Sequence, residues 1–240
     1  MIDVHCHLLP GIDDGPKSLE ESLSLARYAV EHGITKSVVT PHIHVGRYQN
    51  ARESITQACD EFRRALEENR IPLEIGFAAE VRIGIEIIPM IESGSIPFLG
   101  KHNGLDVLLL EFPHSHVPPG SDKLINWLFQ HNICPLIAHP ERNKGIMSNY
   151  QKIEPLIELG CILQVTAGSV TGQFGKEAMH CAEFLLRKGY VTLLASDAHN
   201  LKHRPPRLDD GRDAAARIVG EALAREMVQD RPLAIITGMN

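Results

Sequence analysis

The sequence predicts an α/β protein that folds as a single-domain (β/α)7 barrel. Seven short apolar or β-branched segments alternate with seven helical patterns, which is typical of parallel strands joined by right-handed crossovers. Candidate ligand side chains follow six of the seven strand segments. An open sheet would gather such residues at one switch point, whereas a barrel brings all its strand ends to one mouth. The spread of the candidates therefore favours the barrel.

The elements are bounded by glycine, proline or polar residues. The strands are expected at residues 2–6, 35–40, 73–79, 106–112, 133–138, 161–166 and 191–196. The helices are expected at residues 18–32, 51–69, 85–93, 121–131, 150–159, 175–188 and 210–228. Ser18 and Glu21 form a candidate capping box at the start of the first helix. Gly33, Gly160 and Gly189 stand where left-handed residues are expected to end helices. Residues 112–120 are expected to form a loop over the strand ends.

Composition excludes several classes of protein. The chain has 240 residues and a net charge of -6, without a basic tail or stripe, so nucleic-acid binding has no electrostatic support. The five cysteines are scattered and form no Cys-x-x-Cys pair, which predicts reduced thiols in a cytoplasmic protein. No apolar run approaches the roughly 18 residues of a membrane span. The first residues already read as a strand, so no signal peptide is expected.

Two i, i+2 patterns indicate a metal site. Side chains alternate along a strand, so Asp3, His5 and His7 share one face and Cys6 points the other way. Asp197 and His199 repeat this spacing after the last strand. The remaining candidates each follow a strand: His42, Glu80, Glu111 and His139. Imidazole and carboxylate ligands without thiolate suit Mn, Fe or Zn. So many ligands predict two or three ions with bridging carboxylates, for which Glu80 and Asp197 are the natural choices.

The ordered motifs resemble those of the polymerase-and-histidinol-phosphatase (PHP) superfamily, over nearly the whole chain. The motifs are Asp3-Val-His5-Cys-His7, Pro41-His42, His139-Pro140 and Asp197-Ala-His199. Within the superfamily the chain is most similar to the manganese-dependent protein-tyrosine phosphatases of bacterial capsule and exopolysaccharide loci, the CpsB/YwqE type. The segments that carry this closer likeness are His7-Leu-Leu-Pro-Gly-Ile-Asp13-Asp14-Gly15, Thr40-Pro-His42, Ala79-Glu80, Glu111-Phe-Pro, Ala138-His139-Pro-Glu-Arg142 and Ala195-Ser-Asp197-Ala-His199-Asn200.

The resemblance implies a distorted TIM-like barrel, the PHP fold, as one phosphatase domain over residues 1–240. It also implies a trinuclear manganese site. One ion would take His5, His7, Glu80 and Asp197. A second would take Glu80, Glu111 and His139, and a third Asp14, His42 and His199. Arg142 and Arg204 would bind the substrate phosphate. The residues alone leave Asp13 open beside Asp14, Arg207 beside Arg204, and His44 beside His42.

The activity implied by the resemblance is hydrolysis of phosphotyrosine by a metal-activated hydroxide. The substrate would be a phosphotyrosine protein, the C-terminal tail of a capsule-regulating bacterial tyrosine kinase. A small-molecule phosphatase such as histidinol-phosphate phosphatase is the alternative. A non-catalytic metal module and a nuclease are disfavoured by the complete ligand set and the acidic balance. A cysteine phosphatase would have to use Cys181-x5-Arg187, which lacks the glycine that a phosphate-binding loop needs.

Overall fold

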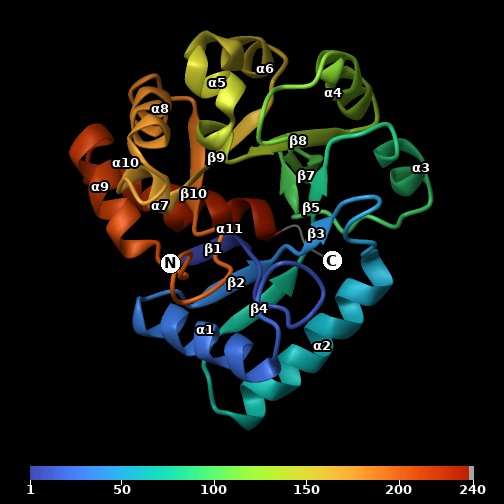
Figure 1. Ribbon diagram of the computed structural model, residues 1–240, viewed down its shortest axis with the longest axis vertical. Coiled ribbons are helices and arrows are strands. Elements are labelled where there is room, and N and C mark those ends of the chain that lie inside the picture. Colours follow the sequence, from blue (N-terminus) through green and yellow to red (C-terminus); the bar gives the residue numbers. More distant parts are fainter. Residues whose placement is uncertain (238–240) are drawn as a thin grey trace.

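The computed structural model describes residues 1–237, and its strands form a barrel with helices packed around it (Figure 1). One parallel sheet has the order β1-β2-β4, with β1 (Ile2–Cys6), β2 (Lys36–Val39) and β4 (Glu74–Phe77). A second path has the order β10-β9-β8-β7-β5-β3. Its strands are β3 (His42–Ile43), β5 (Glu80–Arg82), β7 (Leu105–Glu111), β8 (Ile133–Ala138), β9 (Ile162–Thr166) and β10 (Val191–Ala195). The short β6 (Lys101–His102) pairs antiparallel with β7.

The two sheets close into one barrel. In the chain, β3 follows β2 and β5 follows β4 after short interruptions. Two strands of the first sheet therefore lead directly into two strands of the second. A parallel bridge between Cys6 and Ala198 joins β1 to the segment after β10. There the Asp197 N–H donates to the His5 carbonyl at 2.8 Å, and the His7 N–H donates to the Ala198 carbonyl at 2.8 Å. The predicted seven-stranded barrel is confirmed, and the open sheet is excluded.

The helices surround the strands and follow the predicted alternation. The longer ones are α1 (Leu19–Glu31), α2 (Arg52–Glu68), α3 (Ile87–Glu92), α4 (Ser121–Gln130), α8 (Lys176–Arg187), α9 (Asp209–Val219), α10 (Glu221–Val228) and α11 (Asp230–Ile236). Short turns complete the set: η1 (Pro140–Arg142), α5 (Lys144–Ser148), η2 (Tyr150–Ile153), α6 (Glu154–Glu158) and α7 (Ala167–Val170). None of the helices in the described residues combines the length and apolarity needed to span a bilayer.

Two apolar cores explain why the strands direct ligands inward. The larger core lies between strands and helices, and it includes Leu108 and Leu110 of β7. The smaller core gathers the alternate residues, Val107 and Leu109 of β7, with apolar residues of other strands and of α11. Because side chains alternate, Glu111 continues the inward row and projects into the barrel at the end of β7.

The structure departs from the predicted elements at several points. The predicted strands 35–40 and 73–79 end at Val39 and Phe77, and the chain resumes as β3 and β5 after short interruptions. The predicted helix 150–159 is the short turns η2 and α6, and α11 has no counterpart among the predicted helices. The predicted helix 210–228 is two helices, because Gly220 takes a left-handed φ of 90°. At α1, Ser18 accepts from Glu21 N–H at 3.3 Å, but the Glu21 carboxylate accepts from Lys17 N–H instead of closing the predicted box.

Candidate metal centre and active site

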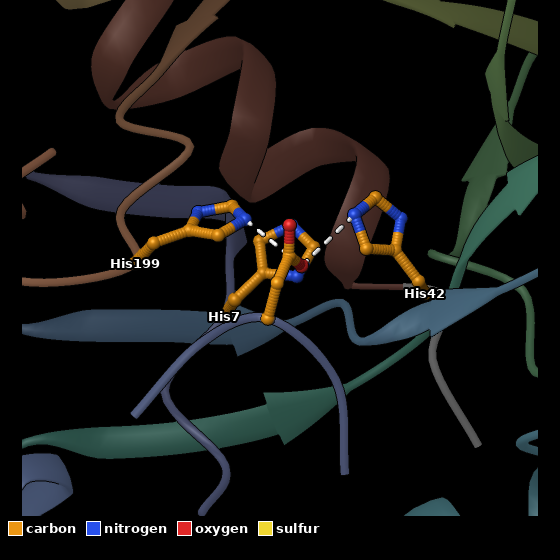
Figure 2. A group of neighbouring side chains, drawn as sticks. His7, His42 and His199 are labelled. Atoms are coloured by element: carbon orange, nitrogen blue, oxygen red, sulfur yellow. Dashed lines mark ion pairs between the residues drawn. The ribbon is translucent and has the colours of Figure 1, made fainter. Parts of the chain in front are cut away.

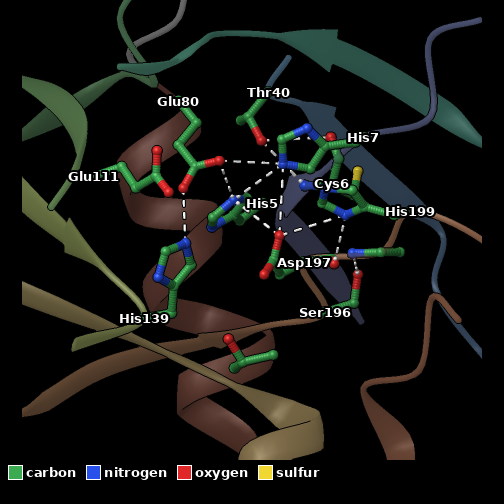
Figure 3. A network of polar contacts seen from close by, with 12 residues as sticks. His5, Cys6, His7, Thr40, Glu80, Glu111, His139, Ser196, Asp197 and His199 are labelled. Atoms are coloured by element: carbon green, nitrogen blue, oxygen red, sulfur yellow. Dashed lines mark hydrogen bonds and ion pairs between the residues drawn. The ribbon is translucent and has the colours of Figure 1, made fainter. Parts of the chain in front are cut away.

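The predicted ligands come together at the carboxyl ends of the barrel strands, where barrel enzymes place their sites. They are His5, His7, Asp14, His42, Glu80, Glu111, His139, Asp197 and His199. Most lie within a strand or within four residues of its end, and Asp14 lies farther along the loop between β1 and α1. Every residue that the sequence proposed as a ligand therefore reaches the same region. Figure 3 shows most of this network around Glu80 and His5.

The deepest group of ligands has the spacing of a coordination shell. His5, His7, Glu80 and Asp197 are fully buried. The Nε2 atoms of the two histidines lie 3.2 and 3.3 Å from Glu80 Oε2, and 3.4 and 3.5 Å from Asp197 Oδ1. Tetrahedral ligands about 2.1 Å from one ion lie about 3.4 Å from one another. This group therefore fits a single cation without rearrangement.

Two further groups share members with the first. Asp14 Oδ1 lies 3.3 Å from His42 Nε2 and 3.4 Å from His199 Nε2 (Figure 2), and His7 lies within the same group. On the other side, His42 Nδ1 lies 3.1 Å from Glu80 Oε2. His42 thus presents its two ring nitrogens to different groups. Glu80 belongs both to the deepest group and to the group that contains His42 and Glu111.

The group that contains Glu111 differs from the set implied by the resemblance. Glu111 Oε2 lies 3.8 Å from His42 Nδ1, and these two atoms group with Glu80. His139 instead lies on the other oxygen of Glu80, with Nε2 2.8 Å from Oε1. Glu80 is thus the common neighbour of Glu111 and His139, and His42 is an additional member of the Glu111 group.

Buried polar atoms without a hydrogen-bond partner point to a missing cation. Such atoms normally have partners, and each exception needs an explanation. Five of them belong to the ligand groups: His42 Nδ1, Glu80 Oε2, Glu111 Oε2, Asp197 Oδ1 and His199 Nε2. All five are acceptors or ring nitrogens that could face a divalent ion. The donor set is therefore complete and suited to metal.

A second layer of residues orients the histidines. Asp13 Oδ2 lies 2.6 Å from His7 Nδ1, and Gln164 Oε1 lies 2.7 Å from His5 Nδ1. Such partners hold each ring with its other nitrogen turned toward a metal. Asp13 also accepts from Gly15 N–H at 2.9 Å, and a Cβ at Gly15 would lie only 2.7 Å from the His7 carbonyl oxygen. Of the two adjacent aspartates, Asp13 therefore supports a ligand, and Asp14 faces the ligand group.

Two residues of the site have strained backbones. His139 and Asp197 take left-handed φ values of 33° and 52°, which non-glycine residues rarely adopt. Such conformations cost on the order of 1–3 kcal/mol each and are concentrated at functional sites. In each case the left-handed residue directly follows a strand or lies two residues beyond it, and it turns a side chain into the barrel mouth.

The charge states of the site suit cation binding. Burial would raise the pKa of Glu80, but His5 and His42 outweigh it and hold that pKa well below its ordinary value. Burial likewise opposes ionisation of Asp197, yet Arg142 and Arg204 lower its pKa. Burial also lowers the pKa of His139 to about 3, so this ring is neutral at pH 7, the form that binds metals.

Two ligand carboxylates respond differently to their surroundings. Burial, together with the neighbouring Glu80, raises the pKa of Glu111 to about 7. Burial would also raise the pKa of Asp14, but hydrogen bonds from His199 and His42 lower it. Glu111 is thus the carboxyl group that most lacks a compensating positive charge, although Arg82 approaches it at 2.9 Å.

The two predicted phosphate-binding arginines lie beside the ligand groups. The guanidinium groups of Arg142 and Arg204 both pair with Asp197 Oδ2. They line a pocket of about 320 Å³ that also contains Asp14 and His139. The Arg142 guanidinium lies 4.6 Å from the ring centroid of Phe174, which also lines the pocket.

Other sequence candidates lie outside the ligand groups. Arg207 pairs with Asp209 and Asp210, away from the pocket lining. His44 is not a member of any ligand group. Its backbone forms an antiparallel bridge with Tyr48. His114 lines the pocket without joining a ligand group.

Three residues at or near the site were not among the sequence predictions. Gln164 is the contribution of β9, the one predicted strand for which no ligand was proposed. A polar residue inside an otherwise apolar strand was the available signal. Arg82 pairs with Glu111, and Phe174 packs on Arg142, and neither has a comparable signal. Asp3, although on the expected strand, accepts a hydrogen bond from Ser196 N–H at 3.0 Å and joins no ligand group.

The structure excludes the cysteine-dependent alternative. Cys181 and Arg187 both lie in α8, so the Cys-x5-Arg segment is a helix and not a phosphate-binding loop. All five cysteines are free and buried. Burial raises the pKa of Cys181 to about 12, which disfavours the thiolate that a nucleophile needs.

Comparisons with known proteins bear on the family and the enzyme class of the chain. The family model described as capsular polysaccharide synthesis, CpsB/CapC, matches residues 1–237. Tyrosine-protein phosphatase YwqE of Bacillus subtilis is 37% identical over 204 residues, which cover 85% of this chain and 79% of that protein. Tyrosine-protein phosphatase CpsB of Streptococcus pneumoniae is 32% identical over 242 residues, or 98% of each chain.

The solved structures give the same result. The crystal structures of YwqE from Bacillus subtilis and CpsB from Streptococcus pneumoniae, described as unique metal-dependent tyrosine phosphatases, include a similar chain. It matches with a TM-score of 0.91 and 32% identity. That match covers 100% of this chain and 96% of the other. Organophosphorus hydrolase from Deinococcus radiodurans matches with a TM-score of 0.58 and 15% identity, covering 99% of this chain and 92% of the other, which shows a shared fold alone. The predicted family and enzyme class are confirmed, and the chain belongs to the CpsB/CapC family of capsular polysaccharide synthesis proteins.

Proposed function

We propose that this chain is a manganese-dependent protein-tyrosine phosphatase with a trinuclear site. The observation that carries the proposal is the convergence of nine ligand side chains at one end of the barrel, beside a pocket that Arg142 and Arg204 line. Nitrogen and oxygen ligands without thiolate suit Mn²⁺, with Fe or Zn as the other metals of this class. The orphaned buried atoms of the ligand groups support the presence of cations.

The proposed ligand sets are those that the family resemblance implies. They follow the three groups of residues, except that the second set takes His139, which contacts Glu80, in place of His42. The first ion takes His5, His7, Glu80 and Asp197. The second takes Glu80, Glu111 and His139, and the third takes Asp14, His42 and His199. Bound divalent cations supply water activation and neutralise charge on the phosphate.

The protein's own residues would bind and orient the substrate. Arg142 and Arg204 bind the phosphate oxygens, and their planar guanidinium groups suit this geometry. Phe174 holds Arg142 in place by packing on its face. The tyrosine phenolate has a pKa near ~10 in water and can leave without strong acid assistance. The neutral His139 is consistent with this, because its ring is not an imidazolium that could act as a general acid toward the phenolate oxygen.

The proposed substrate is a phosphotyrosine on a protein, the C-terminal tail of a bacterial tyrosine kinase that regulates capsule or exopolysaccharide synthesis, in the cytoplasm. The family description, capsular polysaccharide synthesis, supports the link to capsule or exopolysaccharide synthesis. The decisive test compares kcat/KM for a phosphotyrosine peptide with that for histidinol phosphate, under the same Mn²⁺ concentration. The peptide should be the better substrate. A higher kcat/KM for histidinol phosphate would reject the protein substrate.

Removal of the cations should abolish activity. Treatment with a chelator should eliminate phosphotyrosine hydrolysis, and Mn²⁺ should restore it better than Mg²⁺ or Ca²⁺, because histidine nitrogens disfavour the harder ions. Alkylation of the native protein should leave the rate unchanged, since all five cysteines are buried. Elemental analysis before and after chelation gives the number of ions per chain. Activity that survives chelation but not alkylation would contradict a metal mechanism.

The Asp13→Asn variant should bind Mn²⁺ about 10- to 100-fold more weakly, which is the usual cost of losing a partner of a ligating histidine. The carboxylate that holds His7 Nδ1 at 2.6 Å becomes neutral, so the ring is a weaker ligand. Activity titrated against Mn²⁺ measures the change, and saturating metal should recover most of kcat. Asp60→Asn, on the exposed face of α2, is the matched control. Equal Mn²⁺ affinity in both variants would remove Asp13 from the site.

A further inference from the structure

The pocket carries more positive charge than one phosphate requires. Arg142 and Arg204 are assigned to the phosphate by the proposed function. Arg47 and Arg82 line the same pocket, and Lys144 follows its lining residue Asn143. The chain as a whole has a net charge of -6, so this concentration runs against its overall balance. The remaining positive groups around the pocket are therefore candidates for binding a second anionic group.

Arg47 is held in a defined position at the edge of the site. It lies in a short hairpin, where the N–H groups of Arg47 and Tyr48 donate to the His44 carbonyl at 2.9 and 2.8 Å. The Tyr48 ring stacks on His42, with centroids 5.4 Å apart and an angle of 9° between the rings. The Arg47 guanidinium lies 5.0 Å from the Tyr48 centroid on this stack. The stack fixes Arg47 relative to a ligand histidine.

Lys144 is attached to the loop that follows β7. Its N–H donates to the His114 carbonyl at 2.9 Å, and His114 lines the pocket. Burial lowers the pKa of His114, and the nearby charges of Lys144, Arg142 and Arg82 lower it further. Lys144 therefore lies at the edge of the pocket, beside His114.

Two of these cations are available to bind an anion. Arg82 is engaged with both oxygens of Glu111, at 2.9 and 3.0 Å. Arg47 and Lys144 are exposed, and among residues 1–237 neither side chain forms an ion pair. Their place beside the proposed phosphate site points to contact with an anionic substrate.

We propose that Arg47 and Lys144, the basic rim, bind a second anionic group of the substrate that lies close to the phosphotyrosine in its sequence. This inference rests on the proposed function. The pocket volume of about 320 Å³ is at the small end for ligand sites, so it holds one side chain and leaves the neighbouring residues of the peptide at the rim. Guanidinium and ammonium groups bind carboxylates and phosphates alike, so the group is an acidic side chain or a second phosphotyrosine.

Four matched peptides test the proposal with the manganese-loaded enzyme. One phosphotyrosine is flanked by Gln, by Glu, by Lys or by a second phosphotyrosine. At low salt, KM for the Glu peptide should be about fivefold lower than for the Gln peptide, and KM for the Lys peptide should be higher. The second phosphotyrosine should lower KM further, because a phosphate carries nearly two charges at pH 7. The preference should shrink as salt is added.

Variants of the rim decide whether these residues cause the preference. In the double variant Arg47→Gln/Lys144→Gln, the ratio of KM values for the Gln and Glu peptides should fall toward one. The double variant Arg217→Gln/Arg225→Gln, in the last turns of α9 and α10, removes the same two charges outside the pocket and should keep the parent's ratio. Arg82 is left intact, because it pairs with the proposed ligand Glu111.

Each outcome separates this inference from the proposed function. Equal KM values for the Gln, Glu and second-phosphotyrosine peptides in the parent enzyme would overturn the basic rim, and so would a preference that the double variant retains. A gain with the second phosphotyrosine alone would support a rim that selects phosphate over carboxylate. Failure of the parent to hydrolyse any of the four peptides would instead count against the proposed function.

Discussion

The Glu80→Gln variant should lose about 10³-fold or more of its activity on a phosphotyrosine peptide, equivalent to roughly 4 kcal/mol of transition-state stabilisation. The change is almost isosteric, but it removes the one negative charge shared by the ligand groups. Glu80 Oε2 lies within 3.3 Å of a ring nitrogen of His5, His7 and His42. A neutral amide cannot bridge cations in the same way, so bound Mn²⁺ should also fall by at least one ion per chain.

The control for this variant lies on β4, the strand that precedes β5 in the chain. Glu74→Gln makes the same change at the start of β4, where the carboxylate is 69% exposed and pairs only with Lys36. It should retain the parent's metal content and activity within about twofold, since surface pairs contribute little. Thermal unfolding of both variants shows whether the fold is intact. Full Mn²⁺ occupancy with near-normal turnover in Glu80→Gln would show that this carboxylate does not organise the centre.

Much of the centre could be predicted because its residues are marked locally. His5 and His7 are two residues apart on a strand, and Asp197 and His199 repeat that spacing, so each pair reaches the barrel mouth from one strand end. Glu111 ends an apolar run whose alternate residues face the interior, and this pattern fixes its direction. The sequence determines these features within a few residues, before any long-range contact forms.

The remaining parts depend on contacts between distant segments. Asp13 and Asp14 are neighbours, and only the position of His7 Nδ1 relative to Gly15 shows which of them supports a ligand. Gln164 reaches His5 across 159 residues of sequence, so neither strand identifies the pair alone.

Local signals were also available but unused. Gly220 marks the break between α9 and α10, and glycine in a helix interior is a recognised source of such breaks. Asp209 and Asp210 follow Arg207 at two and three residues, and both pair with it. This local acidity engages Arg207, which leaves Arg204 as the residue that reaches Asp197.

The choice between these two arginines leads to the second large effect. Arg142→Gln and Arg204→Gln should each reduce kcat/KM by about 10- to 100-fold, because a hydrogen bond to a charged group contributes roughly 1.5–3 kcal/mol. The double variant should lose more than either single variant, since both guanidinium groups would hold the same phosphate. Steady-state kinetics on a phosphotyrosine peptide measures these losses.

Arg207→Gln is the control that the structure supplies, because it makes the same substitution on an arginine that pairs with Asp209 and Asp210 and lies outside the pocket lining. It should retain the parent's kcat/KM within about twofold. Mn²⁺ content should stay unchanged in all of these variants, because the arginines reach Asp197 Oδ2 whereas the ligand histidines face Oδ1. A loss of metal would mean that the arginines only support the centre. A loss of activity in Arg207→Gln as large as that in Arg204→Gln would reverse the assignment of the phosphate-binding residue.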